Sequence, residues 1–413
     1  MIEEKMKLFK SIAAVLLVSL LPFGSLAAED ASAGANAFTK CLRELRGEAA
    51  AAGVTPALFD RLTAGLQPDR EVLAFLDAQP EFITPIWDYL SGLVDEERIE
   101  DGQQMLAEWQ AVLARVEAEY AVDAATVVAV WGVESNYGRN FGKRPLLQSL
   151  SALSCEGRRQ KFFRGELFTT MKIIGEGHVA AERLTGSWAG AFGHTQFMPS
   201  TFMRLAVDFD GDGRRDLVDS VPDALASTAN FLRRAGWQQQ LPWGREVKLP
   251  AGFDVSLAGR RNKHSVASWS GRGVRLLDGG ALEDVFRGGQ TAVALLLPAG
   301  REGPAFLVTR NFDALFSYNA AESYALAIAH LADRLRGGSA FVTRWPTDDP
   351  GLSRAERREL QRLLLARGHE IGEVDGMIGA RSREALRQVQ AELGLPVDGR
   401  AGQRSLAALR AAR

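Results

Sequence analysis

The sequence predicts a mainly α-helical protein that carries a small β-containing insertion and ends in a compact helical module. Apolar residues recur at helical spacing through residues 36–120 and again from Tyr324 to Leu335. Within residues 241–312, two short apolar runs are separated by a turn, which is typical of paired strands. Residues 352–411 contain an internal repeat, which indicates a separate folding unit at the end of the chain.

Length and composition are those of a chain with a sizeable core. The 413 residues allow two or three domains. With 46% hydrophobic and 24% charged residues, the composition is ordinary for a globular protein. Lys plus Arg number 49 against 51 Asp plus Glu, so no basic excess favours nucleic acid and we expect no such partner.

The N-terminus has the layout of a secretory signal. Three lysines precede the apolar run 12–21, and the small residues 25–28 follow it. The run is too short for an ordinary membrane helix, which makes an uncleaved anchor the weaker alternative. No cysteine at the cleavage site offers a lipid attachment point, and no later segment is apolar enough to span. We expect residues 1–28 to be a signal peptide and the mature chain to reach the periplasm without a membrane span.

The chain has two cysteines, Cys41 and Cys155. Export places them in an oxidising compartment, where disulfides form and persist. We expect one disulfide that ties the N-terminal helical region to the core. The alternative is a pair of buried free thiols.

The elements follow one another in a clear order. Residues 36–120 are predicted to be helical, and residues 123–236 remain largely helical with Gly-rich interruptions. In the insertion, 291–297 and 305–309 are the apolar runs, with a Pro-Ala-Gly turn between them. Helical spacing then returns and stops at Gly337-Gly338, a usual helix terminator. The mature chain thus divides into a main domain, a Gly- and Pro-containing linker and a terminal module, at residues 29–336, 337–351 and 352–411.

The terminal module contains the repeat. Val374-Asp375-Gly376 recurs as Val397-Asp398-Gly399, and the residues after each Asp-Gly match at the same offset of 23 positions. Asp-Gly favours a tight turn. Ser382 and Ser405 then stand where a helix N-cap is expected. On the residues alone, a small three-helix bundle without a ligand explains this pattern.

A first chemical motif is Trp-Gly-Val-Glu-Ser-Asn-Tyr-Gly, residues 131–138. It ends an apolar helix that starts near Ala124, and Glu134 lies in the last turn. A carboxylic acid in apolar, partly dry surroundings has its pKa raised, as a general acid requires. The alternative is a solvated residue at a helix end.

A second motif spans residues 186–200, Gly-Ser-Trp-Ala-Gly-Ala-Phe-Gly-His-Thr-Gln-Phe-Met-Pro-Ser. Its glycines allow a ligand to approach the backbone closely. Its aromatic and amide groups suit sugar rings and N-acetyl groups, and His194 is a weaker candidate for ligand contact. A tight crossing of two helices explains the same composition about equally well.

At these motifs the sequence resembles the lytic murein transglycosylase B family. The stretch around Glu134 matches the family's catalytic motif, and residues 186–200 match its glycan-groove motif. Tyr318-Asn319, followed by Tyr324 on a helix, matches a third part of the groove. The three matches run in the family's order across residues 36–336. The terminal repeat resembles the small peptidoglycan-binding domain often fused to such enzymes, with Ser where Thr is common.

The resemblance implies a lysozyme-like core that cleaves the β-1,4 bond between N-acetylmuramic acid and N-acetylglucosamine, with 1,6-anhydro ends as product. Glu134 would act as acid and then as base, and no cofactor is required for this chemistry. Hydrolysis usually needs two carboxylates, and Glu156 is the nearby alternative. By carry-over, these residues would line or shape the groove: Ser187, Gln196, Phe197, Met198, Tyr318, Asn319 and Tyr324. Peptidoglycan glycan strands would be the partner.

Two alternatives stay open. One is a hydrolytic muramidase on the same scaffold, which would leave reducing ends in place of anhydro ends. The other is a non-catalytic protein that binds peptidoglycan without cutting it. The intact motif around Glu134 argues against the second.

A third motif, residues 208–219, fits the calcium-loop template through its sixth position. Acidic ligands stand at positions 1, 3 and 5, a glycine makes the turn, and the next residue can offer its carbonyl. Position 12 is Asp219, which reaches less well than Glu, and the family pattern favours Asp223. Helices are expected at 199–205 and 222–235, on either side. The predicted ligands of a structural calcium ion are Asp208, Asp210, Asp212, Arg214 and Asp223, and the alternative is a solvated acidic turn.

Overall fold

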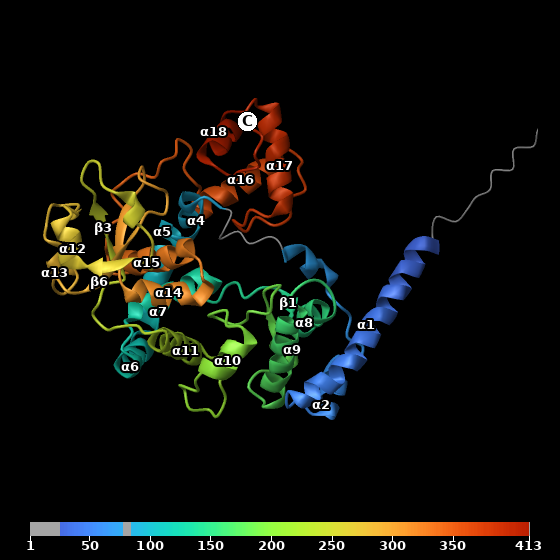
Figure 1. The fold of residues 1–413 in the computed structure, drawn as a ribbon. Coiled ribbons are helices and arrows are strands. Elements are labelled where there is room, and N and C mark those ends of the chain that lie inside the picture. Colours follow the sequence, from blue (N-terminus) through green and yellow to red (C-terminus); the bar gives the residue numbers. More distant parts are fainter. Residues whose placement is uncertain (1–24, 77–83, 413) are drawn as a thin grey trace, which may run out of the picture.

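The computed structural model describes residues 25–76 and 84–412, with side chains from residue 36 onward (Figure 1). Most of the predicted signal peptide, residues 1–24, lies outside the described residues. Among the helices in the described ranges, none combines the length and apolar character needed to cross a membrane.

The predicted mainly α-helical fold is confirmed. The N-terminal region consists of α1 (Ser25–Ala51), α2 (Pro56–Thr63), α4 (Ile86–Leu93), α5 (Glu96–Glu108) and α6 (Gln110–Tyr120). The central region consists of α7 (Ala124–Ser135), α8 (Leu146–Cys155), α9 (Gln160–Gly175), α10 (Pro199–Leu205) and α11 (Val221–Arg234). After the insertion follow α14 (Arg310–Asn319) and α15 (Glu322–Leu335). The two helices expected beside the acidic loop are therefore α10 and α11.

Two apolar cores divide the main domain. One surrounds α7 and includes the buried faces of α4, α5, α6, α11, α14 and α15, and the other joins α8, α9 and α10 to α1 and α2. Val127, Val128 and Val130 of α7 are fully buried, as expected for a helix that is apolar on all sides. Phe231 and Tyr318 pack against both cores, so they mark the boundary between them.

The insertion forms a five-stranded antiparallel sheet with strand order β4-β6-β7-β3-β5. Its strands are β3 (Gly244–Lys248), β4 (Lys263–Ser265), β5 (Arg275–Leu276), β6 (Ala292–Leu296) and β7 (Ala305–Val308), with the short helices α12 (Val266–Gly271) and α13 (Leu282–Val285) between them. The two predicted apolar runs are β6 and β7.

Both faces of this sheet are buried. Along β6, Val293 and Leu295 pack into the insertion's own core, whereas Ala294 and Leu296 pack into the core around α7. This alternation follows from the two-residue period of a strand. The sheet is therefore part of the main domain, and it ends at Val308, just before α14 begins.

Cys41 and Cys155 are joined by a disulfide bond with a Cα–Cα distance of 5.9 Å. Cys41 lies on α1 and Cys155 is the last residue of α8. The bond thus ties the N-terminal helical region to the core that contains α8 and α9. A cross-link across 114 positions removes conformational freedom from the unfolded chain and is typically worth about 2–5 kcal/mol.

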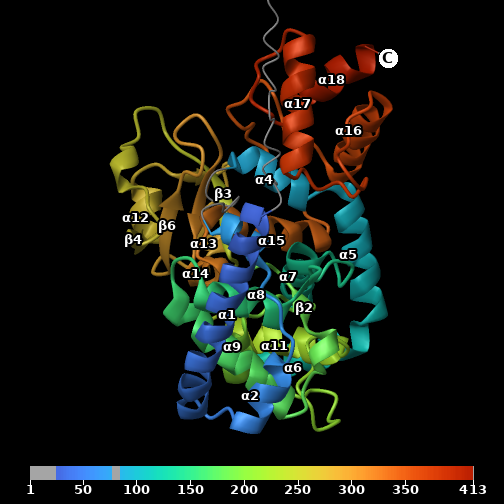
Figure 2. The ribbon, with the colours of Figure 1, turned by 90° about the vertical axis from the view of Figure 1, so that its right-hand side faces the viewer.

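The terminal module is a three-helix unit with its own apolar core, made of α16 (Arg354–Ala366), α17 (Ala380–Glu392) and α18 (Gln403–Ala411). Figures 1 and 2 both place it against α4 and α5 of the main domain. A buried glutamine from the preceding helix closes each of the two Asp-Gly turns. The Gln361 Oε1 accepts from the Gly376 N–H at 2.7 Å, and the Gln390 Oε1 accepts from the Gly399 N–H at 2.8 Å.

The predicted N-caps of this module were wrong. Gly379 and Gly402 cap α17 and α18, and Ser382 and Ser405 lie at the third position inside the helices. Both serines are buried, so their hydroxyls face the interior and not the helix end. The Ser405 hydroxyl accepts from the side-chain amide of Gln390 at 3.1 Å, which uses it in the network that closes the turn.

The linker contains no helix or strand in residues 337–351, yet it packs against the main domain. The Phe341 ring stacks on His330 with a centroid distance of 3.8 Å. The backbone N–H groups of Val342 and Thr343 donate to the carboxylate of Glu246 at 2.9 and 2.8 Å. The segment therefore follows a defined path between the two parts of the chain.

Candidate active site

Glu134 lies in the last turn of α7 and is half-buried. The helix ends because Asn136, Tyr137 and Gly138 all adopt positive φ, at 51°, 58° and 82°. A left-handed residue other than glycine costs roughly 1–2 kcal/mol, although asparagine tolerates it better than most. We call residues 136–138 the catalytic turn. Two strained residues in a row require contacts that hold this turn in place.

Several of these contacts come from side chains close to the turn. The Ser135 hydroxyl donates to the backbone oxygen of His194 at 2.5 Å and accepts from the Gly138 N–H at 3.0 Å. The Tyr137 hydroxyl donates to the backbone oxygen of Arg98 at 2.8 Å. The catalytic turn is thus anchored on α5 and on the second motif.

The Glu134 carboxylate accepts a hydrogen bond from the hydroxyl of Tyr324, which lies on α15. Tyr318 stacks on Tyr324 with ring centroids 6.2 Å apart. Burial, followed by the nearby charge of Glu134, raises the pKa of both tyrosines well above the ordinary value. Both hydroxyls therefore stay protonated, and Tyr324 remains a donor to the carboxylate at any ordinary pH.

Tyr318, from the third part of the predicted groove, meets the second motif. Its hydroxyl donates to the backbone oxygen of Thr195 at 2.7 Å, and its ring lies 4.6 Å from that of Phe231 and 5.8 Å from that of Phe197. Phe197 is 1% exposed, so it supports the Tyr318 ring from behind. Met198 is half-buried and directly precedes α10.

The remaining predicted groove residues lie on loops or helix ends. Gln196 has a φ of 50°, and its side-chain amide donates to the backbone oxygens of Phe141 at 3.1 Å and Gly193 at 2.9 Å. The Ser187 hydroxyl accepts from the Ala191 N–H at 3.0 Å, and Asn319 is exposed at the end of α14. Gln196 and Ser187 thus shape the backbone of the second motif in the free protein.

The glycines of the second motif are needed for packing of the chain itself. A Cβ on Gly186 would stand 2.1 Å from the backbone oxygen of Ala191, and one on Gly193 would stand 2.4 Å from that of Leu217. Backbone segments approach one another too closely at these points for any side chain. The motif therefore serves chain packing at these positions.

His194, considered above for ligand contact, belongs to the interior. It is 9% exposed, and its Nδ1 accepts from the Trp131 indole N–H at 3.0 Å. Its ring meets those of Trp131 and Phe141 edge to face. Burial lowers its pKa to about 4, so it is a neutral acceptor that packs against α7. The sequence motif contained this residue but gave no sign of its partner.

Glu156, the alternative second carboxylate, follows the last residue of α8 next to the disulfide. It accepts from the guanidinium of Arg70 at 3.0 Å. That ion pair joins it to the N-terminal helical region, so its charge already has a partner there.

The acidic loop brings the first three predicted metal ligands together. One carboxylate oxygen each of Asp208, Asp210 and Asp212 lies within 4.8 Å of the others, and all three residues are exposed. The Asp208 carboxylate also accepts from the N–H groups of Gly211 and Gly213 at 2.8 and 2.9 Å, which fixes the loop's curvature. A cluster of hard oxygen donors on a tight loop fits Ca²⁺.

The other predicted ligands have different surroundings. Asp223 is fully buried, and its carboxylate accepts from the N–H groups of Phe209, Asp210 and Asp216 at 2.7, 3.2 and 2.8 Å. Burial raises its pKa. Asp223 thus ties the loop to α11 from outside the cluster of three. The Arg214 side chain pairs with Asp212 at 2.9 Å. The predicted ligand at this residue is its backbone carbonyl, which this ion pair does not involve.

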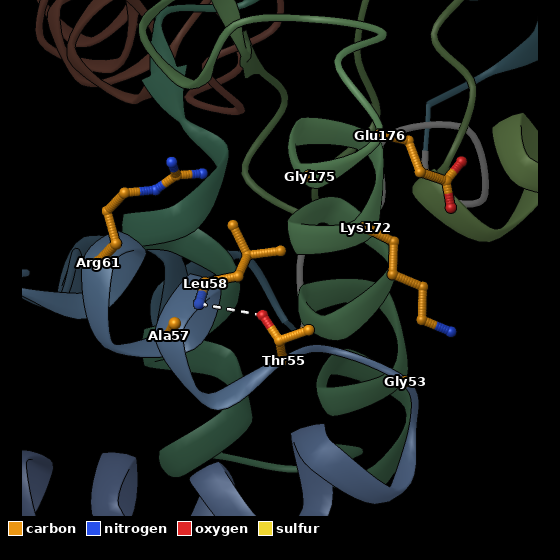
Figure 3. A pocket seen from close by; sticks show the side chains of 8 residues that line it. All are labelled: Gly53, Thr55, Ala57, Leu58, Arg61, Lys172, Gly175 and Glu176. Carbon is orange, nitrogen blue, oxygen red and sulfur yellow. Dashed lines mark hydrogen bonds between the residues drawn. The ribbon is translucent and has the colours of Figure 1, made fainter.

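A cavity of about 680 Å³ lies elsewhere, between α2 and α9 (Figure 3). Its lining contains none of the residues predicted for catalysis or glycan binding. The side chains of Arg61 and Lys172 lie on opposite sides of it and point away from each other. The two cations therefore do not converge on a common ligand.

The chain is similar to known families over most of its length. The sequence profile of the transglycosylase SLT domain matches residues 37–333, and that of a peptidoglycan binding domain matches residues 353–409. The chain is 30% identical over 264 residues to the membrane-bound lytic murein transglycosylase B of Escherichia coli K12. That alignment covers 62% of this chain and 66% of the relative, just under two thirds of its length.

Solved structures share the fold. SltB3 from Pseudomonas aeruginosa, in complex with NAG-anhNAM-pentapeptide, is 48% identical, with a TM-score of 0.73 over 90% of this chain and 99% of that one. The lytic transglycosylase Slt35 of Escherichia coli, in complex with calcium, is 26% identical, with a TM-score of 0.62 over 73% of this chain and 92% of that one. These similarities confirm the predicted lysozyme-like, transglycosylase-type architecture with a helical terminal module.

Proposed function

Because the chain belongs to the transglycosylase SLT domain family, we propose that it is a peptidoglycan lytic transglycosylase. It cleaves the β-1,4 bond between N-acetylmuramic acid and N-acetylglucosamine and leaves a 1,6-anhydromuramyl end. The observation that carries the assignment of the catalytic residue is the hydrogen bond from the Tyr324 hydroxyl to the carboxylate of Glu134, at the end of a buried helix.

In this mechanism one carboxyl group performs both proton transfers. Glu134 protonates the glycosidic oxygen as the bond to C1 of the muramyl sugar breaks. The resulting carboxylate then takes the proton of the C6 hydroxyl, whose oxygen bonds to C1. One carboxylate suffices because nucleophile and electrophile belong to the same sugar and are held close. Tyr324 fixes which oxygen of Glu134 faces the substrate.

The groove is formed by polar and aromatic groups that surround Glu134. Its lining consists of Ser187, Gln196, Tyr318, Asn319 and Tyr324, and Phe197 and Met198 shape it. Tyr318 supports this proposal because it touches both the second motif and Tyr324. A glycan strand is the ligand. The structures of SltB3 with muropeptide fragments support this ligand class.

The acidic loop holds a structural calcium ion. Its ligands come from Asp208, Asp210 and Asp212, the Arg214 carbonyl and Asp223. The cluster of three carboxylates and the calcium complex of Slt35 support this proposal. The ion offsets the mutual repulsion of the carboxylates and braces the segment between α10 and α11. It takes no part in the chemistry.

The chain is organised for work outside the cytoplasm. Residues 1–28 are a signal peptide, residues 29–336 the catalytic domain with its insertion at about 241–312, residues 337–351 the linker and residues 352–411 a peptidoglycan-binding domain. The periplasm is the place of action, because peptidoglycan lies there. The match of residues 353–409 to a peptidoglycan binding domain supports the role of the module.

The test is mass spectrometry of fragments released from purified peptidoglycan by the mature protein, with Glu134→Gln as the control. We expect anhydromuramyl products, and a loss of roughly 10²–10⁴-fold in rate for the variant, the usual contribution of a general acid or base. Reducing-end products would assign the chain to the hydrolytic muramidases. Peptidoglycan binding without any release would make it a non-catalytic binding protein.

A further inference from the structure

A side chain of the terminal module reaches the catalytic turn. Arg354 is the first residue of α16, directly after the N-cap Ser353, and it is 8% exposed. Its guanidinium donates to the side-chain oxygen of Asn136 at 2.5 Å. Asn136 is the left-handed residue that ends α7, two positions after Glu134. A residue of the peptidoglycan-binding module thus bonds directly to the catalytic turn.

Acidic groups of α5 fix the position of this arginine. Its guanidinium lies 3.7 Å from the carboxylate of Asp95, 3.6 Å from that of Glu97 and 3.4 Å from that of Asp101. Its backbone N–H donates to Asp95 at 3.0 Å, and the same carboxylate caps α5 by accepting from the Arg98 N–H at 2.8 Å. One buried carboxylate therefore holds the first turns of α5 and α16 together.

The catalytic turn has a specific need for such a contact. Asn136 and Tyr137 are consecutive residues with positive φ, and neither is glycine. Tyr137 is held through its hydroxyl on Arg98, and Asn136 is held through its amide oxygen on Arg354. A charged donor makes a stronger hydrogen bond than a neutral one. The turn that sets the direction of Glu134 therefore takes one of its side-chain anchors from the other domain.

The same docking surface has a second group of contacts that lies away from the turn. Arg400 donates to the carboxylate of Asp88 on α4 at 2.6 and 2.7 Å and also pairs with Asp349 of the linker. These contacts attach the module to the main domain as Arg354 does, but their partners are on α4 and the linker. The chain thus offers two arginine contacts that can be removed separately, one from the buried Arg354 and one from the half-buried Arg400.

We propose that Arg354 is a positioning residue for catalysis, so that docking of the terminal module sets the catalytic turn and with it the direction of the Glu134 carboxyl group. This inference rests on the proposed function of Glu134. It gives the module a second role besides binding peptidoglycan. A module that is pulled away from the main domain would leave Asn136 without its charged donor and slow the reaction.

The test compares full-length variants on soluble, uncross-linked glycan strands, for which binding by the module adds little. Arg354→Met should lower kcat roughly tenfold with KM within about twofold, because a misdirected acid affects the chemical step more than ground-state binding. Arg400→Gln is the matched control. It should lower the melting temperature to a similar degree while kcat stays within about twofold of the wild type.

Asn136→Gly breaks the contact from the other side. Glycine keeps the left-handed conformation at no steric cost but offers no oxygen to Arg354. We expect the same roughly tenfold loss in kcat, and no further loss when it is combined with Arg354→Met, since both changes remove one interaction. If Arg354→Met yields no folded protein, the loss in Asn136→Gly alone decides the question.

Three results would overturn the inference. The first is that Arg354→Met and Arg400→Gln have equal kcat values. The second is that Asn136→Gly has the kcat of the wild type. The third is that the losses in kcat of Arg354→Met and Asn136→Gly multiply when the two changes are combined. In each of these cases the wild type is active and Glu134→Gln is not, so the proposed function stands. A wild-type protein that releases no product would instead refute the proposed function, and the inference with it.

Discussion

Two groups of carboxylates in this chain lie in opposite surroundings. Glu134 is half-buried at the end of an apolar helix and accepts from a tyrosine that stays neutral. Asp208, Asp210 and Asp212 are exposed and gather within 4.8 Å of one another. In the proposed function the same functional group exchanges a proton in one region and binds a cation in the other. Environment, more than residue type, decides between these roles.

The two regions are also built differently. The acidic loop closes on itself, since the Asp208 carboxylate accepts from N–H groups three and five positions later. The catalytic region depends on side chains from distant segments: Tyr324 bonds to Glu134 across 190 positions, and Arg354 bonds to Asn136 of the catalytic turn across 218 positions. A site built from neighbouring residues can be recognised in the sequence and can form locally. A site built from distant residues forms only when the whole chain has folded.

Acid should therefore weaken the buried region before it weakens the loop. Burial lowers the pKa of His194 to about 4, while an unfolded histidine titrates near 6.5. Between these values the unfolded chain binds a proton that the folded chain does not. Stability is thus fully present above pH 6.5 and falls as the pH drops toward 4, by up to about 3 kcal/mol. Denaturant unfolding at pH 7 and pH 4.5 measures this loss.

His194→Gln should remove that share of the pH dependence, because glutamine can still accept from Trp131. His330, whose pKa burial also lowers to about 4, contributes in the same window, and His330→Gln is the matched control. The loop behaves differently. Hydrogen bonds from Arg214 lower the pKa of Asp212, so its contribution is lost only below the ordinary Asp range. An unchanged pH dependence in His194→Gln would contradict this account of the buried region.

Calcium should act on the loop and leave the catalytic turn alone. At a hundredfold excess over Kd, a bound ion stabilises the folded state by about 2–3 kcal/mol and raises the melting temperature by several degrees. Asp210→Asn should remove most of this increase while kcat stays near that of the wild type. Glu182→Gln, an exposed acid outside the loop, should leave it intact. Equal melting temperatures with calcium and with a chelator would mean that the loop holds no useful ion.

The sequence predicted those parts of the fold that have a local cause. Helical spacing found the helices, and the apolar runs found β6 and β7, whose residues are nearly all buried. The strands β3, β4 and β5 contain no such apolar run, because their pairing is set by neighbours far along the chain. The N-cap error at Ser382 and Ser405 has a related cause. A hydroxyl near a helix start resembles a cap in the sequence, and the buried Gln390 that uses the Ser405 hydroxyl lies 15 positions away.

The candidate site shows the same division. The motif around Glu134 and the acidic loop are continuous stretches, so Glu134 and the aspartates could be proposed from the sequence. The pair of Trp131 with His194 and the contact of Asn136 with Arg354 could not be, since nothing local marks either partner. The sequence around Arg354, at the start of a helix in another domain, does not indicate that its side chain contacts Asn136.

The smallest effect is expected from removal of the Tyr324 hydroxyl. Tyr324→Phe removes the hydroxyl that donates to Glu134 and keeps the ring. A hydrogen bond to a charged group is worth about 1.5–3 kcal/mol, so kcat should fall at least roughly tenfold. Tyr318→Phe is the matched control, because its hydroxyl donates to the backbone oxygen of Thr195, and it should cost less.

The pH dependence of kcat shows whether Tyr324 acts through its hydrogen bond to Glu134 or only through packing. A hydrogen bond donated to a carboxylate favours the charged form, so its loss in Tyr324→Phe should move the limb of the kcat profile that reports Glu134 to higher pH. A tyrosine that only fills space would lower kcat without moving that limb. If the limb stays in place and Tyr318→Phe costs as much as Tyr324→Phe, the two rings serve packing alone. In that case the hydrogen bond from Tyr324 would not distinguish Glu134 from the aspartates of the loop, and burial alone would do so.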